Sequence, residues 1–418
     1  MEKLTRRDVL AATAAGGLIT AATQVHAATF GNPDEPPQGA INTEGNPAST
    51  AIIGPNNPAL SGQFPGALSP PATDVGSLPM FWASFNNAPR RIQNGGWARQ
   101  VTQEDFQISE TIAGVNMRLT RGGIREMHWH VYAEWAFVTK GTCRITTIDQ
   151  DGRANVEDVH QHGLWYFPPG LPHSLQGVGE DGCEFVICFD NGRASEFDTL
   201  LLTQWMAHTP PEVLALNFGV PSGSFSKIPL HDLYIFQGKL PGPIEEDARE
   251  AQGNAGTPKL RSSFPLGETA PVKKTRGGEV RIADSKNFEA SKTIAAALVR
   301  IHPQGMREMH WHPNADEWLY IVEGEAEVTV FETGPNVVTQ NFNAGDIGYV
   351  KRSQGHYLRN TGHTDLVYLE VFRSSYFADV SLSDWLTHTP PAMVSQTLNV
   401  DHETIARFPD GKPAILPV

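Results

Sequence analysis

Two segments of the chain carry histidines in a pattern that can bind a metal ion. Each segment has two histidines separated by one residue, a glutamate soon after them, and a third histidine farther along. The eight side chains are His128, His130, Glu134 and His173, followed by His310, His312, Glu317 and His356. Three neutral imidazoles and one carboxylate, without a thiolate, suit Mn(II) or Fe(II) in six coordination with two adjacent positions open. The sequence therefore predicts two redox-capable metal sites.

A strand and a turn are needed to bring each set of side chains together. Residues two apart in a β-strand point to the same side, so His128 and His130 can both face the interior of a barrel. The turn sequence Pro168-Pro169-Gly170 can then return His173 across that interior. The alternative is a set of ordinary core histidines with satisfied hydrogen bonds. The repetition of the complete set favours the metal sites.

An internal duplication organises the chain. The run Ile-Arg-Glu-Met-His-Trp-His at 124–130 returns as Met-Arg-Glu-Met-His-Trp-His at 306–312, an offset of 182 residues. Solenoid repeats are much shorter, at roughly 20 to 50 residues. The duplication therefore predicts two tandem domains of similar structure.

Short β-branched and aromatic runs indicate that both domains are all-β barrels or sandwiches. In the first half these runs cover 134–139, 144–148, 164–167 and 185–189, and Gly, Pro or Asp separates them. Residues 199–207 and 380–387 have helical periodicity and stop at the sequence His-Thr-Pro-Pro, because proline disfavours helical geometry in the residue before it. We expect these short helices to pack outside the barrels.

The ends and the middle of the chain suggest further boundaries. Residues 5–10 have a twin-arginine pattern, and small residues near 25–27 suit a cleavage site, so we expect a signal peptide over 1–27 and a periplasmic or secreted protein. A retained membrane helix is the weaker alternative, since the apolar stretch is short and interrupted. We expect an extended arm over 28–80, domains over 81–233 and 234–418, and a linker or exposed loop at 238–256.

The charge of the chain limits its partners. A net charge of -14 over 418 residues argues against nucleic acid and against an anionic membrane. If the substrate is a small dianion, the overall charge would repel it, and the site would then need a local cation. Arg125 and Arg307 are candidates, although a regular strand would point them away from the histidines and a bulge or bend would have to turn them inward. The alternative is that they are surface arginines.

The three cysteines, Cys143, Cys183 and Cys188, cannot all pair with one another. We expect them to act as small buried hydrophobic residues. Cys183 and Cys188 lie five residues apart in a predicted strand, which points them to opposite faces.

The spacing of the first metal-site motif resembles that of the bicupin oxalate decarboxylases. The matching positions are Gly122, His128, His130, Glu134, Gly141, Pro168, Gly170 and His173. The second half departs from the pattern where Gln304 replaces a glycine and Lys351 replaces a proline, which affects turns and no ligand. The resemblance runs from about Phe81 to the final helix. It implies two cupin barrels, each a double-stranded β-helix of jelly-roll type.

The resemblance also implies an activity. The family converts oxalate to formate and CO2 with one Mn(II) in each domain and O2 as cofactor, and related bicupins form homotrimers or homohexamers. Arg125 and Arg307 match arginines that polarise the bound carboxylate. Glu196 matches a proton donor on a mobile lid over 190–199, although Phe197 and Asp198 replace more polar residues there. The alternative for Glu196 is an ordinary acid at a helix N-terminus.

The second domain has no comparable lid sequence. Glu370, on a late strand where the first domain has Ile187, is its candidate acid. We expect the first site to carry most of the turnover.

Two other functions compete with decarboxylation. Without a placed acid, the reaction would give a second CO2 and hydrogen peroxide, so the altered lid keeps oxalate oxidase or another cupin dioxygenase as an alternative. A non-catalytic storage or sugar-binding bicupin should have lost metal ligands, whereas all eight are present.

Overall fold

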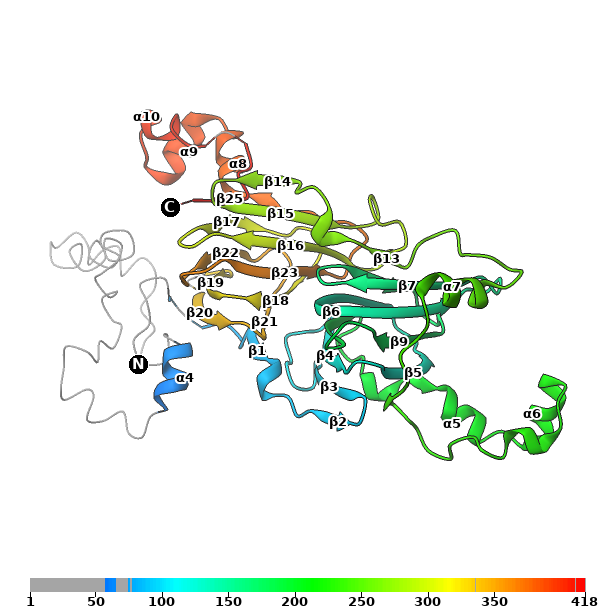
Figure 1. Cartoon of the computed structure of the whole chain (residues 1–418). Helices are drawn as coiled ribbons and strands as arrows, with labels where there is room; N and C mark the ends of the chain where they lie inside the picture. Colours follow the sequence, from blue (N-terminus) through cyan, green and yellow to red (C-terminus); the bar gives the residue numbers. More distant parts are fainter. Residues whose placement is uncertain (1–56, 65–73, 76, 335, 410, 418) are drawn as a thin grey trace, which may run out of the picture.

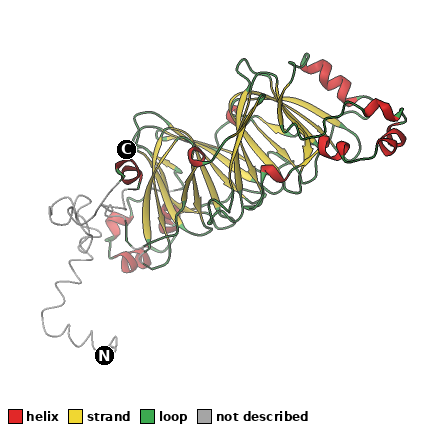
Figure 2. Ribbon diagram, turned by 90° about the horizontal axis from the view of Figure 1, so that it is seen from below, coloured by secondary structure: helices red, strands yellow, loops and turns green. Residues whose placement is uncertain are grey.

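The computed structural model describes residues 57–64, 74–75, 77–334, 336–409 and 411–417. The expected signal peptide and most of the expected arm lie outside these residues. Two all-β barrels lie side by side, with short helices at both ends of the molecule (Figures 1 and 2). The predicted fold class is thus confirmed. Among the described residues, no helix has the length and hydrophobicity that crossing a bilayer requires.

The first barrel is a 12-stranded antiparallel arrangement in which β6 belongs to both walls. Its strands are β2 (Arg91–Gln93), β3 (Gly96–Val101), β4 (Ala113–Leu119), β5 (Gly123–Trp129), β6 (Glu134–Ile148), β7 (Ala154–His160), β8 (Leu164–Phe167), β9 (His173–Gly177), β10 (Cys183–Phe189), β11 (Leu200–Leu201), β12 (Ile235–Gln237) and β13 (Ser263–Phe264). The prediction of two separate strands at 134–139 and 144–148 was wrong. Gly141, at φ 76°, and a bulge opposite Glu184 and Phe185 let one strand bend from wall to wall.

The second barrel has two separate walls, of seven and six strands, and the seven include β1 (Trp82–Ser84) from the N-terminal side of the first barrel. The other twelve strands follow one another in the sequence. They are β14 (Lys273–Thr275), β15 (Gly278–Ala283), β16 (Ala295–Ile301), β17 (Met306–Trp311), β18 (Glu317–Glu323), β19 (Glu325–Phe331), β20 (Val337–Asn343), β21 (Asp346–Val350), β22 (Gly355–Asn360), β23 (Leu366–Phe372), β24 (Val380–Ser381) and β25 (Ile415–Leu416). Gly324, the counterpart of Gly141, separates β18 from β19 here.

Each barrel receives a strand from the other half of the sequence. β1 (Trp82–Ser84) pairs with β21 of the second barrel, and β13 pairs with β8 of the first. Ahead of β1, Val75 forms an isolated bridge to Val337. The described part of the N-terminal arm therefore lies on the second barrel.

The helices differ in detail from the prediction. Residues 200–201 and 380–381 pair with the histidine-bearing strands β5 and β17, so α5 (Leu202–Ala207) and α8 (Leu382–Thr387) begin later than expected. A second helix begins at the last proline of each His-Thr-Pro-Pro sequence, because proline suits the first position of a helix. The remaining helices are α4 (Pro58–Gln63), α6 (Pro211–Phe218), α7 (Ile244–Gln252), α9 (Pro391–Leu398) and α10 (His402–Ile405), with 3-10 helices η2 (Phe85–Asn87), η3 (Glu196–Asp198), η4 (Ser222–Phe225) and η5 (Leu266–Glu268). Helix α7 occupies the segment predicted as a linker or loop.

Two apolar clusters hold the barrels together. One fills the first barrel and contains Cys143 and Cys183, whereas the other runs from the barrel interface through the second barrel and contains Cys188. All three cysteines are buried, and Cys183 and Cys188 lie in different clusters, as predicted. Equivalent tyrosines tie the barrels across the interface: the hydroxyl of Tyr166 lies 3.0 Å from that of Thr293, and that of Tyr349 lies 2.9 Å from that of Thr111.

Candidate metal centres

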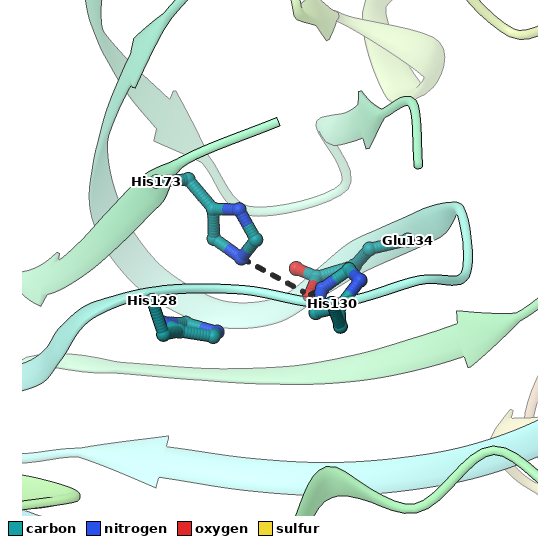
Figure 3. Close-up of side chains that lie close together, drawn as sticks. All are labelled: His128, His130, Glu134 and His173. Carbon is teal, nitrogen blue, oxygen red and sulfur yellow. Dashed lines mark hydrogen bonds and ion pairs between the residues drawn. The ribbon is translucent and has the colours of Figure 1, made fainter. Parts of the chain in front are cut away.

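The first cluster of donor side chains lies inside the first barrel. His128 comes from β5, His130 follows its end, and Glu134 and His173 open β6 and β9. One donor atom from each of the four residues lies within 4.8 Å of the others, and all four residues are buried. Figure 3 shows His173 pointing to Glu134, whose Oε2 lies 3.6 Å from the Nε2 of His173. The structure therefore brings together the four side chains that the sequence singled out.

The second cluster repeats this arrangement in the second barrel. Its members are His310, His312, Glu317 and His356, which are also buried with their donor atoms within 4.8 Å of one another. Oε2 of Glu317 lies 3.1 Å from the Nε2 of His312 and 2.9 Å from that of His356.

Backbone carbonyls orient all six imidazoles. Each Nδ1 lies 2.6 to 3.0 Å from a carbonyl oxygen, which fixes the proton on Nδ1 and leaves the lone pair of Nε2 for the cluster. The accepting carbonyls belong to Glu126, Tyr132, Leu171, Glu308, Ala378 and Gln354, in the order of the histidines they hold.

The donor atoms need a cation between them. Within the described part of the chain, the Nε2 atoms of His310 and His356 and both carboxylate oxygens of Glu317 are buried without a hydrogen-bond partner. A lone pair on Nε2 and a carboxylate oxygen about 3 Å apart repel each other unless a proton or a metal ion lies between them. The two clusters therefore fit a divalent cation.

The protonation tendencies of His128, His310 and the two glutamates fit the same conclusion. Burial lowers the pKa of His128 and of His310 well below the usual value, so both stay neutral and able to coordinate. Burial would raise the pKa of Glu134, but the hydrogen bonds and charges of His130 and His173 lower it overall. The same balance lowers the pKa of Glu317. Burial would lower the pKa of His130 and of His312, but Glu134 and Glu317 raise it overall when no metal ion lies between them.

A tryptophan distinguishes the two clusters. Nε1 of Trp165 donates a 2.8 Å hydrogen bond to Oε1 of Glu134, on the side of the carboxylate away from the histidines. The equivalent position on β21 is Gly348, and no donor among the described residues reaches Oε1 of Glu317. The sequence analysis missed Trp165, although its place opposite β6 in a duplicated strand could have pointed to it.

Arg125 lies inside the first barrel because β5 is irregular. The pairing of β5 with β9 shifts between Arg125 and His128, so the expected bulge turns the arginine inward and the surface alternative is wrong. Its Nε donates to Oε1 of Glu196 at 2.6 Å, and its terminal nitrogens reach the Thr199 hydroxyl at 2.8 Å and the Tyr234 carbonyl at 3.4 Å.

Arg307 has a more acidic environment in the second barrel. The same shift occurs in β17, and the buried guanidinium contacts Glu370 at 3.2 Å and Asp379 at 2.6 Å. Lys412 also binds Asp379, and Tyr368 donates to Glu370 at 3.0 Å. The sequence analysis missed Asp379, Lys412 and Tyr368. Asp379 occupies the position of Thr199, one residue before the short strand that pairs with the histidine strand, and this register could have revealed it.

The two candidate acids are held in different ways. Glu196 lies on η3 between strands, yet its side chain is 1% exposed and faces Arg125, which is unlike an ordinary acid at a helix N-terminus. Glu370 lies on β23 at the position of Ile187 in β10. Burial raises the pKa of Glu370, although Arg307 opposes this effect.

Comparison with known protein families and curated proteins gives matches over both barrels. The family described as cupin matches residues 83–223 and 264–406. The chain is 46% identical over 346 residues to oxalate decarboxylase OxdC of Bacillus subtilis, covering 83% of this chain and 89% of that protein. It is 40% identical over 352 residues to a probable oxalate decarboxylase of Arthroderma benhamiae, covering 83% of this chain and 85% of that protein.

Comparison with solved structures gives the same result. A mutant of Bacillus subtilis OxdC matches with a TM-score of 0.84 and 44% identity, covering 87% of this chain and 95% of that chain. A structure of the same enzyme from work on its Mn(II) centers gives the same values. The likeness therefore extends over most of both molecules.

Proposed function

Because the chain belongs to the oxalate decarboxylase family of two-barrel cupin proteins, we propose that it is a manganese-dependent enzyme that converts oxalate to formate and CO2. The buried pair of Arg125 and Glu196 beside the first His3Glu cluster carries this proposal, since it supplies both an anion-binding cation and an acid.

The metal proposal rests on the donor set. Three imidazoles and one carboxylate in each barrel suit Mn(II), with His128, His130, Glu134 and His173 as ligands in the first barrel and His310, His312, Glu317 and His356 in the second. Bound Mn(II), with O2 as cofactor, would supply the one-electron oxidation that weakens the carbon-carbon bond of oxalate.

Arg125 would bind and polarise the carboxylate of the substrate. A buried guanidinium keeps its charge and presents several donors in a fixed plane, which suits a carboxylate. It also supplies positive charge inside a protein whose net charge is -14. Arg307 would do the same in the second barrel, where it pairs with two carboxylates, those of Glu370 and Asp379, whereas Arg125 pairs with one.

Glu196 would decide the product. After CO2 leaves, the remaining carbon needs a proton to become formate, and the carboxyl group of Glu196 is the candidate donor because it is buried against Arg125 and close enough for its charge to act on His130. General acid catalysis of this kind contributes typically about 10² to 10⁴ in rate. Glu370 is the candidate acid of the second site, and we propose a secondary role for that site.

Oxalate oxidase is the competing activity. Phe197, which follows the candidate acid directly, is 46% exposed, so the segment presents an apolar ring to solvent where relatives of this family carry a polar residue. A change in lid closure would alter the time that Glu196 spends in place. If that proton is not delivered, O2 would take two electrons from the intermediate, which would leave as a second CO2 while O2 becomes hydrogen peroxide.

The proposal includes export and self-assembly. Arg6 and Arg7 support twin-arginine export to the periplasm or beyond. Exposed apolar side chains on both pairs of end helices support a homotrimer or homohexamer; they include Trp205, Leu216, Trp385 and Met393. Lysine at both arginine positions should hold the precursor in the cytoplasm, and light scattering gives the mass in solution.

The decisive experiment is an assay of the purified, manganese-loaded protein with oxalate. We expect formate and CO2 in equal amounts, with little hydrogen peroxide, and manganese in both barrels by elemental analysis. Peroxide with two CO2 per oxalate would identify an oxidase. No consumption of oxalate by protein that holds manganese would refute the proposed function.

A further inference from the structure

Gln100 on β3 holds the segment that carries Glu196. Its Oε1 accepts a 3.0 Å hydrogen bond from the backbone N–H of Glu196, and its amide lies 3.2 Å from the hydroxyl of Ser195. Ser195 in turn caps η3 by accepting from the N–H of Phe197. One glutamine side chain therefore links this segment to a rigid barrel strand.

Phe197 makes a second contact between the segment and the barrel. Its ring centre lies 6.0 Å from that of Tyr234, and the guanidinium of Arg91 lies 5.7 Å from the ring of Phe197 and 3.9 Å from the ring of Tyr234. Asp232 fixes Arg91 through a 2.8 Å ion pair. Tyr234 also packs on Arg125, at 4.3 Å. The lid thus adds an aromatic ring to a stack that reaches the candidate substrate-binding arginine.

The second barrel provides an internal comparison. The positions equivalent to Gln100, Arg91 and Tyr234 are Ile282, Lys273 and Ala414, as the matching strand registers show. The candidate acid of that barrel, Glu370, lies within β23 and needs no lid to hold it. The three residues that contact the lid therefore occur in the first barrel, where the candidate acid lies between strands. Other residues replace them in the second barrel, where the candidate acid lies within a strand.

Substrate binding at Arg125 requires this segment to move. The nitrogens of Arg125 already donate to Glu196, Thr199 and Tyr234, and Glu196 is 1% exposed. A diacid can reach the guanidinium when Glu196 and Thr199 withdraw. The stability of the closed segment therefore enters both substrate binding and proton delivery.

We propose that Gln100 and Phe197 form a latch that keeps Glu196 closed over the first site and thereby sets the division between formate and peroxide. Both are positioning residues, since Gln100 acts through the backbone of Glu196 and Phe197 acts through Tyr234. The effect on the products rests on the proposed function, whereas the claim that the two residues hold the segment closed does not. Weakening the latch populates the open segment: oxalate then binds more readily, lowering KM, while Glu196 is less often in place, lowering kcat for formate and raising the share of peroxide.

The test uses the full-length, manganese-loaded protein with Gln100→Met and Phe197→Ala. Gln100→Met keeps the length of the side chain but removes its hydrogen bonds, and Phe197→Ala removes a ring that is 46% exposed and lies outside both apolar clusters. Phe197→Tyr keeps the ring and should behave as the wild type. Phe331→Ala is the matched control, because Phe331 is 50% exposed on the other barrel.

The first readout is the rate of trypsin cleavage after Arg193, which needs no substrate. Loss of one or two hydrogen bonds, or of the ring contact, should raise the open fraction and the cleavage rate on the order of five-fold. The second readout is the ratio of peroxide to formate, with KM and kcat measured separately. The ratio of peroxide to formate and the rate of cleavage should both rise in Gln100→Met and Phe197→Ala. Both quantities should stay at wild-type values in Phe197→Tyr and Phe331→Ala.

The outcomes separate the two proposals. Wild-type cleavage rates in both Gln100→Met and Phe197→Ala would overturn the latch even if the enzyme makes formate. Faster cleavage with an unchanged product ratio would overturn its role in product selection. A wild type that makes no formate refutes the proposed function, and trypsin still reports whether the latch exists.

Discussion

Nε of Arg125 lies 2.6 Å from Oε1 of Glu196, and both side chains are buried beside the first metal cluster. In the closed conformation the candidate acid thus neutralises the cation that would bind the substrate. The equivalent cation of the second barrel, Arg307, is neutralised by Glu370, which lies on β23, and by Asp379, which lies one residue before β24. Each barrel thus has its own His3Glu cluster, but the glutamate paired with the arginine lies between strands in the first barrel and within a strand in the second.

Replacing Glu196 by glutamine should separate proton delivery from substrate binding. The amide keeps the size of the side chain but supplies no acidic proton, so we expect formate production to fall by about 10² to 10⁴ and peroxide to rise. NMR detection of formate and a peroxidase-coupled assay measure the two products. Glu370→Gln is the matched control and should retain most of the formate. If Glu370→Gln loses formate production and Glu196→Gln retains it, the second barrel is the main site.

Replacing Trp165 by phenylalanine should weaken metal binding in the first barrel alone. The change removes the hydrogen bond to Oε1 of Glu134, and the loss of such an outer partner typically costs 10- to 100-fold in metal affinity, so we expect about ten-fold. Manganese release to a chelator, followed by elemental analysis, measures it. Trp135→Phe is the control, because its Nε1 has no hydrogen-bond partner in the part of the chain that the structure describes. Equal losses in the two variants would contradict a role for the hydrogen bond.

Removing the metal should destabilise the protein. Without a cation, the buried Nε2 atoms and carboxylate oxygens of the clusters face one another without a partner, as the contacts of His312 and Glu317 illustrate. Free manganese at 100 times its Kd would stabilise each site by about 2.7 kcal/mol. Thermal unfolding of chelated protein, with and without added manganese, checks this expectation. A melting temperature that does not respond to manganese would argue against both sites.

Replacing Asp379 by asparagine should destabilise the second barrel in a pH-dependent way. Burial raises the pKa of Asp379, but the charges of Arg307 and Lys412 lower it overall from the ordinary 3.8. A lowered pKa in the folded protein stabilises it above about pH 3.8, and this contribution is lost as the pH falls through the folded-state pKa. We expect the variant to lose about 3 kcal/mol near pH 6 and less near pH 3.

Thermal unfolding at both pH values measures this difference. Glu180→Gln, a neutralised acid on an exposed turn, serves as the control. An equal loss of stability for Asp379→Asn at the two pH values would mean that shape, and not charge, accounts for its contribution.

The sequence was sufficient for the parts of the site that depend on local spacing. Strand alternation predicts that His128 and His130 share a face, and the duplication predicts a second copy of the same pattern. The inward position of Arg125 could be anticipated only as a possible bulge, because the bulge arises from pairing with β9. Fold class and repeat organisation follow from the same local patterns.

Contacts between distant segments account for the rest. Asp379, Lys412 and Trp165 belong to strands or turns whose neighbours are set by barrel closure, so spacing along the chain gives no sign of their partners. The late start of α5 has the same origin, since Leu201 pairs with His128 and is held in extended geometry. The sequence did not predict the charged helix α7, because the glycines and prolines around it indicated a linker or loop.

The strands that cross between the barrels have a consequence for how such a protein can be divided. β1 lies ahead of the first barrel in the chain but completes the second, and β13 follows the first barrel and lines β8. A fragment ending near residue 234 would leave β8 with a bare edge, and the complementary fragment would leave β21 bare, which invites aggregation. Two separately expressed halves should therefore precipitate alone and recover solubility when they are produced in the same cell.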